Sequence, residues 1–263
     1  MFSNKKPGNT RTSLAAIPNA RAGEGGSASR RAVLRTAVAG TAAAGSVLAL
    51  GSAFPATAAP PGPATGDRPT TPEQCLRELA AGNRRWRTYR QEHPHESPST
   101  RLRLAKGQHP FAIVLGCVDS RVPPELVFDQ GLGDLLTVRS AGEVLDEAVL
   151  GSIAYGVLEL AVPLVLVLGH QSCGAVGAAV HADETGERLP AHIQYLADQI
   201  RPAIDHGRQG EARVDATIDA HARRTRDRLA AEPDLARAIS AGKLAVAAAR
   251  YDLHDQRVRT FGP

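Results

Sequence analysis

The chain has 263 residues, 43% of them hydrophobic, which is enough for one α/β core once a leader is set aside. Its formal net charge is +4, but the charge is unevenly distributed. Residues 1–58 hold seven of the 31 Lys and Arg and one of the 27 Asp and Glu, which leaves 24 basic and 26 acidic residues in the rest of the chain. The positive balance therefore comes from the leader, and it argues against a nucleic-acid-binding surface.

Residues 1–58 have the pattern of a twin-arginine-type signal peptide. Arg30 and Arg31 precede a modestly apolar stretch at 36–54 that is rich in Ala, Gly and Ser, and residues 56–58 have the small-residue form of a cleavage signal. The stretch has too few leucine-like residues for a stable membrane span, and a retained signal anchor is the alternative. No cysteine lies near the cleavage signal, which excludes a lipoprotein. We therefore expect an exported protein, recognised by the export machinery through this leader.

Residues 59–70 are rich in Pro and Gly and predict a flexible linker, which makes 71–263 the folded domain. Thr71 and Pro72 predict the start of a helix, with Thr as its cap and Pro in its first turn. Two further features are expected to be exposed and free of ligands: a histidine pair in a loop, and four arginines on a solvated face. They are His93 and His95, and Arg84, Arg85, Arg87 and Arg90.

Two short apolar runs organise the domain, at 111–115 and 164–168. Their β-branched and leucine-rich composition is typical of strands buried on both faces of a parallel sheet. Each run is followed by a polar phrase, at 116–121 and at 169–174. Because ligands of open α/β sheets bind at the carboxyl edge, we expect the two phrases to meet there.

The two phrases supply two thiols and one imidazole, from Cys117, His170 and Cys173. This set suits zinc and leaves the fourth tetrahedral position open, as in catalytic zinc sites. Cys117 lies 53 residues before the histidine (170 − 117), a separation that no zinc finger uses. On spacing alone, two core cysteines and a structural histidine are the alternative. If zinc takes both thiolates, Cys75 has no disulfide partner, and export of the folded protein would protect the site from oxidation.

The remaining pattern predicts alternating strands and helices. We expect a strand at 134–139, a helix at 145–160, a second helix from Gly174, polar helices at 190–240, and two final strands that end near 260. The N-terminus of the helix at Gly174 is expected to lower the pKa of the Cys173 thiol. Four scattered histidines are expected at the surface: His181, His192, His206 and His221.

Five motifs together resemble the β-class carbonic anhydrases. They are C-x-D-S-R at 117–121, V-R-S-A-G at 138–142, G-S-I-A-Y at 151–155, H-x-x-C-G at 170–174 and A-R-Y-D-L at 249–253. The resemblance extends over about residues 73–260. It implies a three-layer α/β/α fold with a mostly parallel central sheet and an antiparallel edge strand, in a homodimer or a higher even homo-oligomer.

The resemblance implies a carbonic anhydrase (carbonate dehydratase), a zinc lyase that reversibly hydrates carbon dioxide to bicarbonate and a proton. Cys117, His170 and Cys173 would bind Zn²⁺, which lowers the pKa of a bound water to ~7, and the resulting hydroxide would attack carbon dioxide. Asp119 would accept a hydrogen bond from that hydroxide, and Arg121 would keep the carboxylate off the metal. In a closed form of such sites, Asp119 becomes the fourth ligand.

The resemblance also implies a set of substrate-binding residues. Gln130 would hydrogen-bond the substrate across the subunit interface, and Gly174 belongs to the same expected set. Val122 and Phe128 would form apolar walls for a nonpolar gas. These two side chains are equally consistent with ordinary core positions.

Three positions depart from the family pattern. Glu143 stands where the family usually has Asn, and Ala154 stands where it often has Glu. Val114 replaces a Trp that, in a subset of the family, forms a regulatory bicarbonate pocket with the arginine matched by Arg139. With Val114 in place, we expect the site aspartate to stay paired to its arginine and off the metal.

Three other functions remain open at this point. One is a zinc hydrolase of the same family that acts on carbonyl sulfide or carbon disulfide. Another is an inactive zinc-binding exported protein, against which the intact Asp119 and Arg121 argue. The last is a cysteine hydrolase with Cys117 or Cys173 as nucleophile, which would need no metal.

Overall fold

The computed structural model describes residues 68–262. The expected signal peptide at 1–58 and residues 59–67 of the expected linker lie outside the described residues. Within the described part of the chain, no helix combines the length and the apolar character needed to cross a bilayer.

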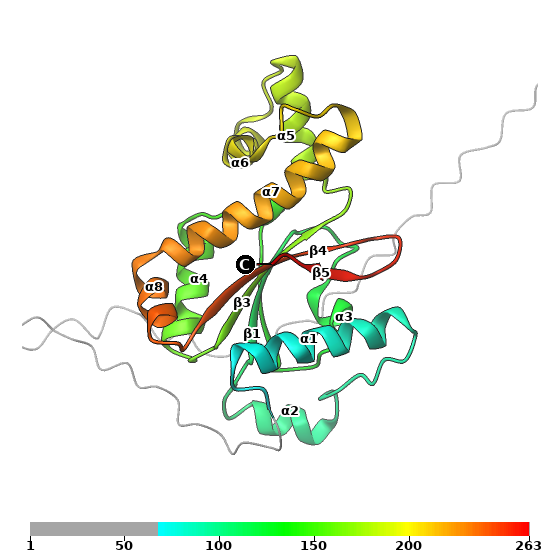
Figure 1. Cartoon of the computed structure of the whole chain (residues 1–263). Coiled ribbons are helices and arrows are strands. Elements are labelled where there is room, and N and C mark those ends of the chain that lie inside the picture. The colour runs from blue at the N-terminus through cyan, green and yellow to red at the C-terminus, as the bar shows by residue number, and fades with distance from the viewer. Residues whose placement is uncertain (1–67, 263) are drawn as a thin grey trace, which may run out of the picture. The chain divides into compact units, whose positions relative to one another are not determined.

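Five strands form one sheet in the order β2-β1-β3-β4-β5, with helices on both faces (Figure 1). The pairs β1–β2, β1–β3 and β3–β4 are parallel, and β4–β5 is antiparallel. The predicted three-layer α/β/α fold with an antiparallel edge strand is confirmed. The strands are β1 (Ala112–Gly116), β2 (Leu135–Arg139), β3 (Leu164–His170), β4 (Ala245–Tyr251) and β5 (Val258–Thr260).

The helices follow the predicted alternation with the strands. They are α1 (Pro72–Arg87), α2 (Pro98–Leu104), α3 (Pro124–Val127), α4 (Glu147–Leu158), α5 (Gly174–Thr185), α6 (Ala191–Ile200), α7 (Gly210–Ala231) and α8 (Pro233–Ser240), with the 3-10 turns η1 (Ala141–Glu143) and η2 (Arg201–Ala203).

The continuous apolar run of β3 is explained by burial on both sides of the sheet. Leu164, Leu166 and Leu168 pack in one core cluster with side chains of α1 and α3. Val165 and Val167 pack in the other, with side chains of α4, α7 and α8. Figure 1 shows these two groups of helices on opposite sides of the sheet. Successive side chains of a strand point to opposite faces, so a strand covered on both faces must be apolar throughout.

Helix α1 begins as predicted and docks on its own chain. The Thr71 side chain accepts a hydrogen bond from the Gln74 N–H, and the Gln74 side chain accepts from the Thr71 N–H, which completes a capping box. Farther along the helix, the buried Asn83 donates to the carbonyls of Val127 and Gln256, and its Oδ1 accepts from the Val258 N–H. One amide therefore fastens α1 to α3 and to the C-terminal hairpin.

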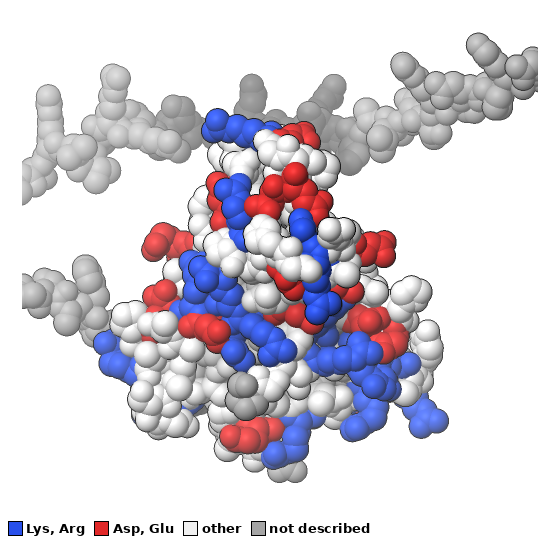
Figure 2. All heavy atoms as spheres, turned by 45° about the horizontal axis from the view of Figure 1, so that its top comes forward, with Lys and Arg blue, Asp and Glu red and all other residues white. Residues whose placement is uncertain are grey.

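Basic and acidic side chains are intermixed on the face that carries α5, α6 and α7 (Figure 2). Ion pairs join neighbouring elements here: Arg213 of α7 lies 2.8 Å from Glu184 of α5, and Arg250 of β4 lies 2.7 Å from Asp215 of α7. The interleaved charges agree with the near-neutral balance of residues 59–263 and give no single-sign surface on this face.

The space around two helix glycines predicts opposite effects of an alanine substitution on the Tm. A Cβ on Gly82 would lie 1.7 Å from the Phe128 carbonyl oxygen, whereas a Cβ on Gly151 of α4 would meet nothing within 4 Å. Ala is intrinsically better than Gly in a helix by about 1 kcal/mol, so we expect Gly151→Ala to raise the apparent Tm by roughly 2–4 °C. Gly82→Ala should lower it, because overpacking costs about 1–3 kcal/mol. A Gly82→Ala protein with an unchanged or higher Tm in calorimetry would contradict this packing.

Candidate metal centre

Three residues that the sequence places far apart meet at the carboxyl edge of the sheet. Cys117 follows the last residue of β1, His170 ends β3, and Cys173 is the N-cap of α5. Their ligand atoms all lie within 4.8 Å of one another, and all three residues are buried. The parallel pairing of β1 with β3 sets Gly116 opposite Leu168, so both chains leave the sheet at the same level. Among the described residues this is the one group of three or more such side chains that could hold a metal ion.

The geometry of this group fits a tetrahedral cation. The two Sγ atoms are 3.9 Å apart. Two thiolates at about 2.3 Å from a tetrahedral zinc would be about 3.8 Å apart. His170 Nδ1 lies 2.9 Å from the Gln171 carbonyl oxygen, which can only accept, so Nδ1 carries the proton. Nε2 is buried and has no hydrogen-bond partner within residues 68–262. Its lone pair is therefore directed into the site, as a metal ligand requires.

As free thiols, the two cysteines share one hydrogen bond. The bond from Cys173 is the largest cause that lowers the pKa of Cys117, to about 4, and the Gly142 N–H at 3.3 Å also stabilises this thiolate. The same bond raises the pKa of Cys173, with burial as the next cause. The pKa of Cys173 as a free thiol therefore rises, because these causes outweigh the predicted lowering by the N-terminus of α5. The Val176 N–H of α5 does act in the lowering direction, but it is the smallest of the causes.

Asp119 is held by Arg121 at the mouth of the site. Arg121 Nε and Nη2 donate to the two carboxylate oxygens at 2.9 and 2.7 Å, and the Arg121 backbone N–H donates to Oδ1 at 2.9 Å. The arginine hydrogen bonds are the main cause that lowers the pKa of Asp119 to about 2. Asp119 Oδ2 is 3.9 Å from His170 Nε2, so the carboxylate is next to the ligand atoms without belonging to their group.

Arg139 holds the backbone that carries Cys117 and Asp119. Its Nε donates to the Cys117 carbonyl at 2.8 Å, and its Nη2 donates to the Asp119 carbonyl at 2.7 Å. Val114, where part of the family has Trp, is fully buried in the core cluster on the α1 side of the sheet. Arg139 is thus engaged within this loop, and its role here is to fix two neighbouring site residues.

His221 of α7 is buried, so its expected surface position is wrong. The residue is 2% exposed, and its Nε2 lies 2.8 Å from the Gly142 carbonyl oxygen. Burial lowers its pKa to about 4. A signal for this burial was present in the sequence, because His221 lies on the helical stripe formed by Ile218, Ala222, Thr225 and Leu229, all buried on α7. The prediction failed because a polar side chain was assumed to face solvent.

Glu143, one of the positions that depart from the family pattern, is also buried. It is 1% exposed, and its Oε2 has no hydrogen-bond partner among the described residues. Burial is the main cause that raises its pKa well above the usual range, and the nearby Cys117 acts in the same direction. Burial and the nearby Cys117 thus both disfavour the charged form of Glu143. Ala154, the other departure, is half-buried on α4.

The residues expected to bind substrate have different surroundings. Val122 and Phe128 are 2% and 1% exposed and belong to the core cluster that includes Leu79 of α1. Gly174 is exposed at the first position of α5, and a Cβ there would meet nothing within 4 Å. Gln130 is buried, and its amide donates to Glu78 Oε1 at 3.1 Å and to the Phe128 carbonyl at 3.0 Å. Their substrate-binding role stays a prediction.

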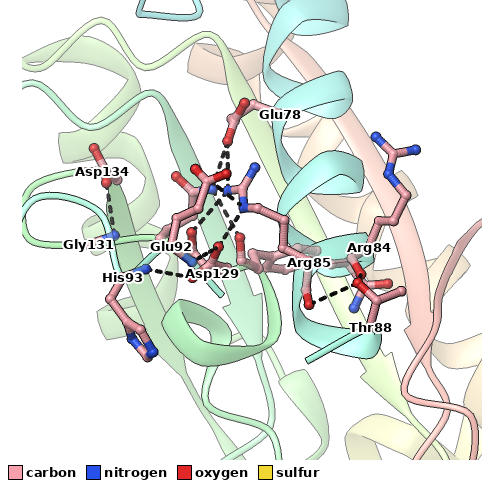
Figure 3. A network of polar contacts seen from close by, with 12 residues as sticks. Glu78, Arg84, Arg85, Thr88, Glu92, His93, Asp129, Gly131 and Asp134 are labelled. Carbon is pink, nitrogen blue, oxygen red and sulfur yellow. Dashed lines mark hydrogen bonds and ion pairs between the residues drawn. The ribbon is translucent and has the colours of Figure 1, made fainter. Parts of the chain in front are cut away.

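The segment around Gln130 is fixed by a polar network on α1 (Figure 3). Arg85 donates through Nε to Asp129 Oδ2, and its Nη2 lies 3.2 Å from Glu78 Oε1. The backbone N–H groups of Glu92 and His93 donate to the same aspartate at 3.1 and 3.2 Å. Arg85 is therefore part of a built network, and its expected place on a solvated face is wrong.

Asp134 anchors the other end of this segment. It accepts from the Gly131 N–H at 2.9 Å (Figure 3) and from Arg68 at 3.0 Å. His95 Nδ1 lies 2.7 Å from the same carboxylate. The histidine pair is in a loop, as predicted, but His95 has a carboxylate partner that lies 39 residues away in sequence.

An open cleft of about 510 Å³ is lined by residues adjacent in sequence to His170 and Cys173. Arg121, Gln171 and Ser172 line one part of it, and Glu211, Asp215 and His254 are among its other lining residues. Arg121 Nη2 also lies 3.4 Å from the Ser172 carbonyl, between the two ligands of the second phrase. Solvent therefore reaches Arg121 from this side, while Cys117, His170 and Cys173 stay buried.

Fold and site define an α/β protein with a Cys–His–Cys group, able to hold a metal, at the carboxyl edge of a mostly parallel sheet. Comparisons with known proteins then give the family. The sequence profile described as carbonic anhydrase matches residues 112–258. The chain is 43% identical over 190 residues to carbonic anhydrase 2 of Mycobacterium tuberculosis (strain H37Rv), which covers 72% of this chain and 92% of the relative. The chain belongs to the carbonic anhydrase family of enzymes.

Other relatives and solved structures agree. A carbonic anhydrase of Mycolicibacterium smegmatis is 41% identical over 191 residues, which covers 72% of this chain and 93% of the relative. The structure of the β-carbonic anhydrase CcaA aligns with a TM-score of 0.59 at 21% identity, over 71% of this chain and 95% of that one. One of two tetrameric β-carbonic anhydrases from Sordaria macrospora aligns with a TM-score of 0.59 at 22% identity, over 72% of this chain and 97% of that one. These structures establish the β-class fold.

The buried neutral His221 predicts a pH dependence of stability. Its pKa falls from the ordinary value of about 6.5 to about 4 on folding, so the unfolded chain binds more protons between these values. The neutral imidazole therefore adds fully to the free energy of unfolding above pH 6.5, and this stability is lost as the pH falls toward 4. Between pH 7 and pH 5 we expect a loss of about 2 kcal/mol in wild type that His221→Gln lacks. Urea unfolding measures this, and equal pH dependences of the two proteins would contradict it.

Proposed function

We propose that this protein catalyses the reversible hydration of carbon dioxide to bicarbonate and a proton, with Zn²⁺ held by Cys117, His170 and Cys173. The observation that carries the proposal is the unpartnered Nε2 of buried His170, facing two thiols beside a carboxylate that an arginine keeps to one side. That set supplies three ligands and leaves a fourth position accessible, which is the arrangement of a catalytic zinc site.

When bound, the zinc ion supplies the Lewis acidity that makes water nucleophilic near neutral pH. The chain's own groups then orient the reactants. With a pKa of about 2, Asp119 is ionised at neutral pH and can only accept a hydrogen bond. Arg121 occupies both of its oxygens, which leaves the carboxylate beside the site and opposes its binding to the cation.

The alternatives have less support. A thiol hydrolase would need an accessible nucleophile, but Cys117 and Cys173 are 5% and 2% exposed. Activity on carbonyl sulfide or carbon disulfide would use the same ligands, and no feature of the described residues favours it over carbon dioxide. An inactive zinc-binding protein would have no need for the two-point clamp on Asp119.

We further propose that the enzyme is a homodimer or a higher even homo-oligomer, in which Gln130 contacts substrate in a neighbouring subunit. Exposed apolar side chains support the proposal: Leu126 and Leu132, close to this glutamine in sequence, are 48% and 49% exposed, and Val118, which follows β1, is 55% exposed. A subunit contact would cover them. Val122, Phe128 and Gly174 complete the proposed substrate-binding set.

We propose that residues 1–58 direct export through a twin-arginine-type route. Support comes from Arg30 and Arg31, from the small-residue signal at 56–58, and from the concentration of positive charge in this stretch. A route for folded proteins suits a site whose two thiolates need metal before they meet an oxidising compartment.

The zinc proposal predicts about one zinc per subunit in the purified mature protein and carbon dioxide hydration in a stopped-flow assay. Cys173→Ser should lose both, because the site loses a thiolate ligand. Cys75→Ser is the matched control and should keep both, since Cys75 is a buried residue of α1 that donates to the Phe111 carbonyl. Full hydration activity in metal-free protein would overturn the proposal.

Arg121→Ala should free Asp119 to bind the metal and close the fourth position. We expect zinc content to stay at the wild-type level while hydration falls by at least about 100-fold. The hydration activity of Arg121→Lys should lie between those of wild type and Arg121→Ala, because an ammonium cannot make the two-point contact. Retained activity in Arg121→Ala would show that the clamp is not needed.

The leader predicts a defined export defect. Replacing Arg30 and Arg31 by Lys should leave the precursor in the cytoplasm, and mass spectrometry of the exported wild-type protein should find a new N-terminus near residue 59. Native protein found uncleaved in the cytoplasm would refute the export proposal.

A further inference from the structure

The geometry points to His221 as a positioning residue for the Cys117 metal ligand, acting through the backbone of Gly142. The inference rests on the proposed zinc function and adds a residue to it that lies on α7, 104 residues beyond the cysteine (221 − 117). His221 contacts neither substrate nor metal.

Two hydrogen bonds make the connection. His221 Nε2 lies 2.8 Å from the Gly142 carbonyl oxygen, and the Gly142 N–H donates to Cys117 Sγ at 3.3 Å. A carbonyl oxygen only accepts, so His221 must donate and its proton is on Nε2. The imidazole therefore fixes the direction of the Gly142 carbonyl, and the same residue directs its N–H at the sulfur.

The backbone of Gly142 has little freedom to direct its N–H at Cys117 Sγ from another conformation. Its φ is +64°, a conformation that side chains disfavour, and a Cβ there would lie 3.0 Å from Ile200 Cδ1 and 3.2 Å from Ala175 Cβ. The residue is thus confined between α5 and α6 with one hydrogen bond on each side. An N–H donated to a ligating thiolate stabilises its charge and restricts its orientation, and such outer contacts are worth 10–100-fold in metal affinity.

A purely space-filling role does not explain a histidine at this position. His221 Nδ1 is buried without a hydrogen-bond partner in the described part of the chain, and the adjacent positions on the same face of α7 are Ile218 and Ala222. An apolar side chain would fill the space without burying an unpartnered nitrogen. The imidazole contributes the one thing that an apolar residue cannot, the donor to the Gly142 carbonyl.

The test compares donor-free and donor-bearing variants of the full mature protein. His221→Met and His221→Leu remove the donor with two different shapes, His221→Gln restores an N–H donor, and Thr225→Val changes another buried position of α7. We expect zinc affinity, measured by chelator competition at pH 7.5, to fall about 10–100-fold in the donor-free pair. His221→Gln and Thr225→Val should stay within about threefold of wild type, well inside that loss.

Cobalt substitution gives a readout that packing alone would not move. The thiolate-to-Co²⁺ absorption band should shift in His221→Met and His221→Leu and keep its wild-type position in His221→Gln. Wild-type affinity and spectrum in whichever donor-free variant folds would overturn the inference while leaving the zinc proposal intact, as would an equal loss in Thr225→Val. Wild-type protein that binds no zinc would overturn the zinc proposal, and this inference with it.

Discussion

The site depends on the parallel pairing of β1 with β3. Both strands are buried on both faces, and their register brings Gly116 level with Leu168, so Cys117 and His170 leave the sheet side by side. Neither a helix nor a local loop could hold two ligands 53 residues apart at this distance. The third ligand follows directly, because α5 starts at the first turn after β3 and has Cys173 as its N-cap. The metal group is thus a consequence of the hydrophobic pattern that forms the sheet.

Around this group, three cationic or polar side chains hold the neighbouring carboxylate and backbone in position. Arg121 holds Asp119 beside the ligand atoms, Arg139 fixes the carbonyls of Cys117 and Asp119, and His221 bonds the glycine whose N–H reaches Cys117. All three act on a carboxylate or on backbone, and each is a donor whose acceptor is fixed by the fold. This division explains how an exposed cleft can border a centre whose ligands are almost fully buried. The pairing of Asp119 with Arg121 is consistent with the prediction, drawn from Val114, that bicarbonate acts as product and not as a cooperative inhibitor.

The sheet, its edge strand and the convergence of Cys117, His170 and Cys173 could be predicted because apolar runs and the polar phrases after them are local signals. The apolar stripe of α7 includes His221 and is visible in sequence. The partners that hold buried His221 and half-buried Arg85 could not be predicted with the same rule, since Gly142 and Asp129 lie far away in sequence. The net rise in the pKa of the free Cys173 thiol could not be predicted. The helix N-terminus, which acts in the lowering direction, is visible in sequence, whereas the hydrogen bond with Cys117 exists only in the folded site. The leader at 1–58 stays a prediction from sequence.

The central claim is that Cys117, His170 and Cys173 hold zinc while Arg121 keeps Asp119 off it. The most direct measurement is a crystal structure of the zinc-loaded mature protein at pH 7.5, with anomalous data at the zinc edge. We expect a single zinc bound by the two sulfurs and His170 Nε2, a solvent oxygen in the fourth position, and Asp119 still paired to Arg121. An Asp119 oxygen in the fourth position, or zinc bound elsewhere, would contradict it.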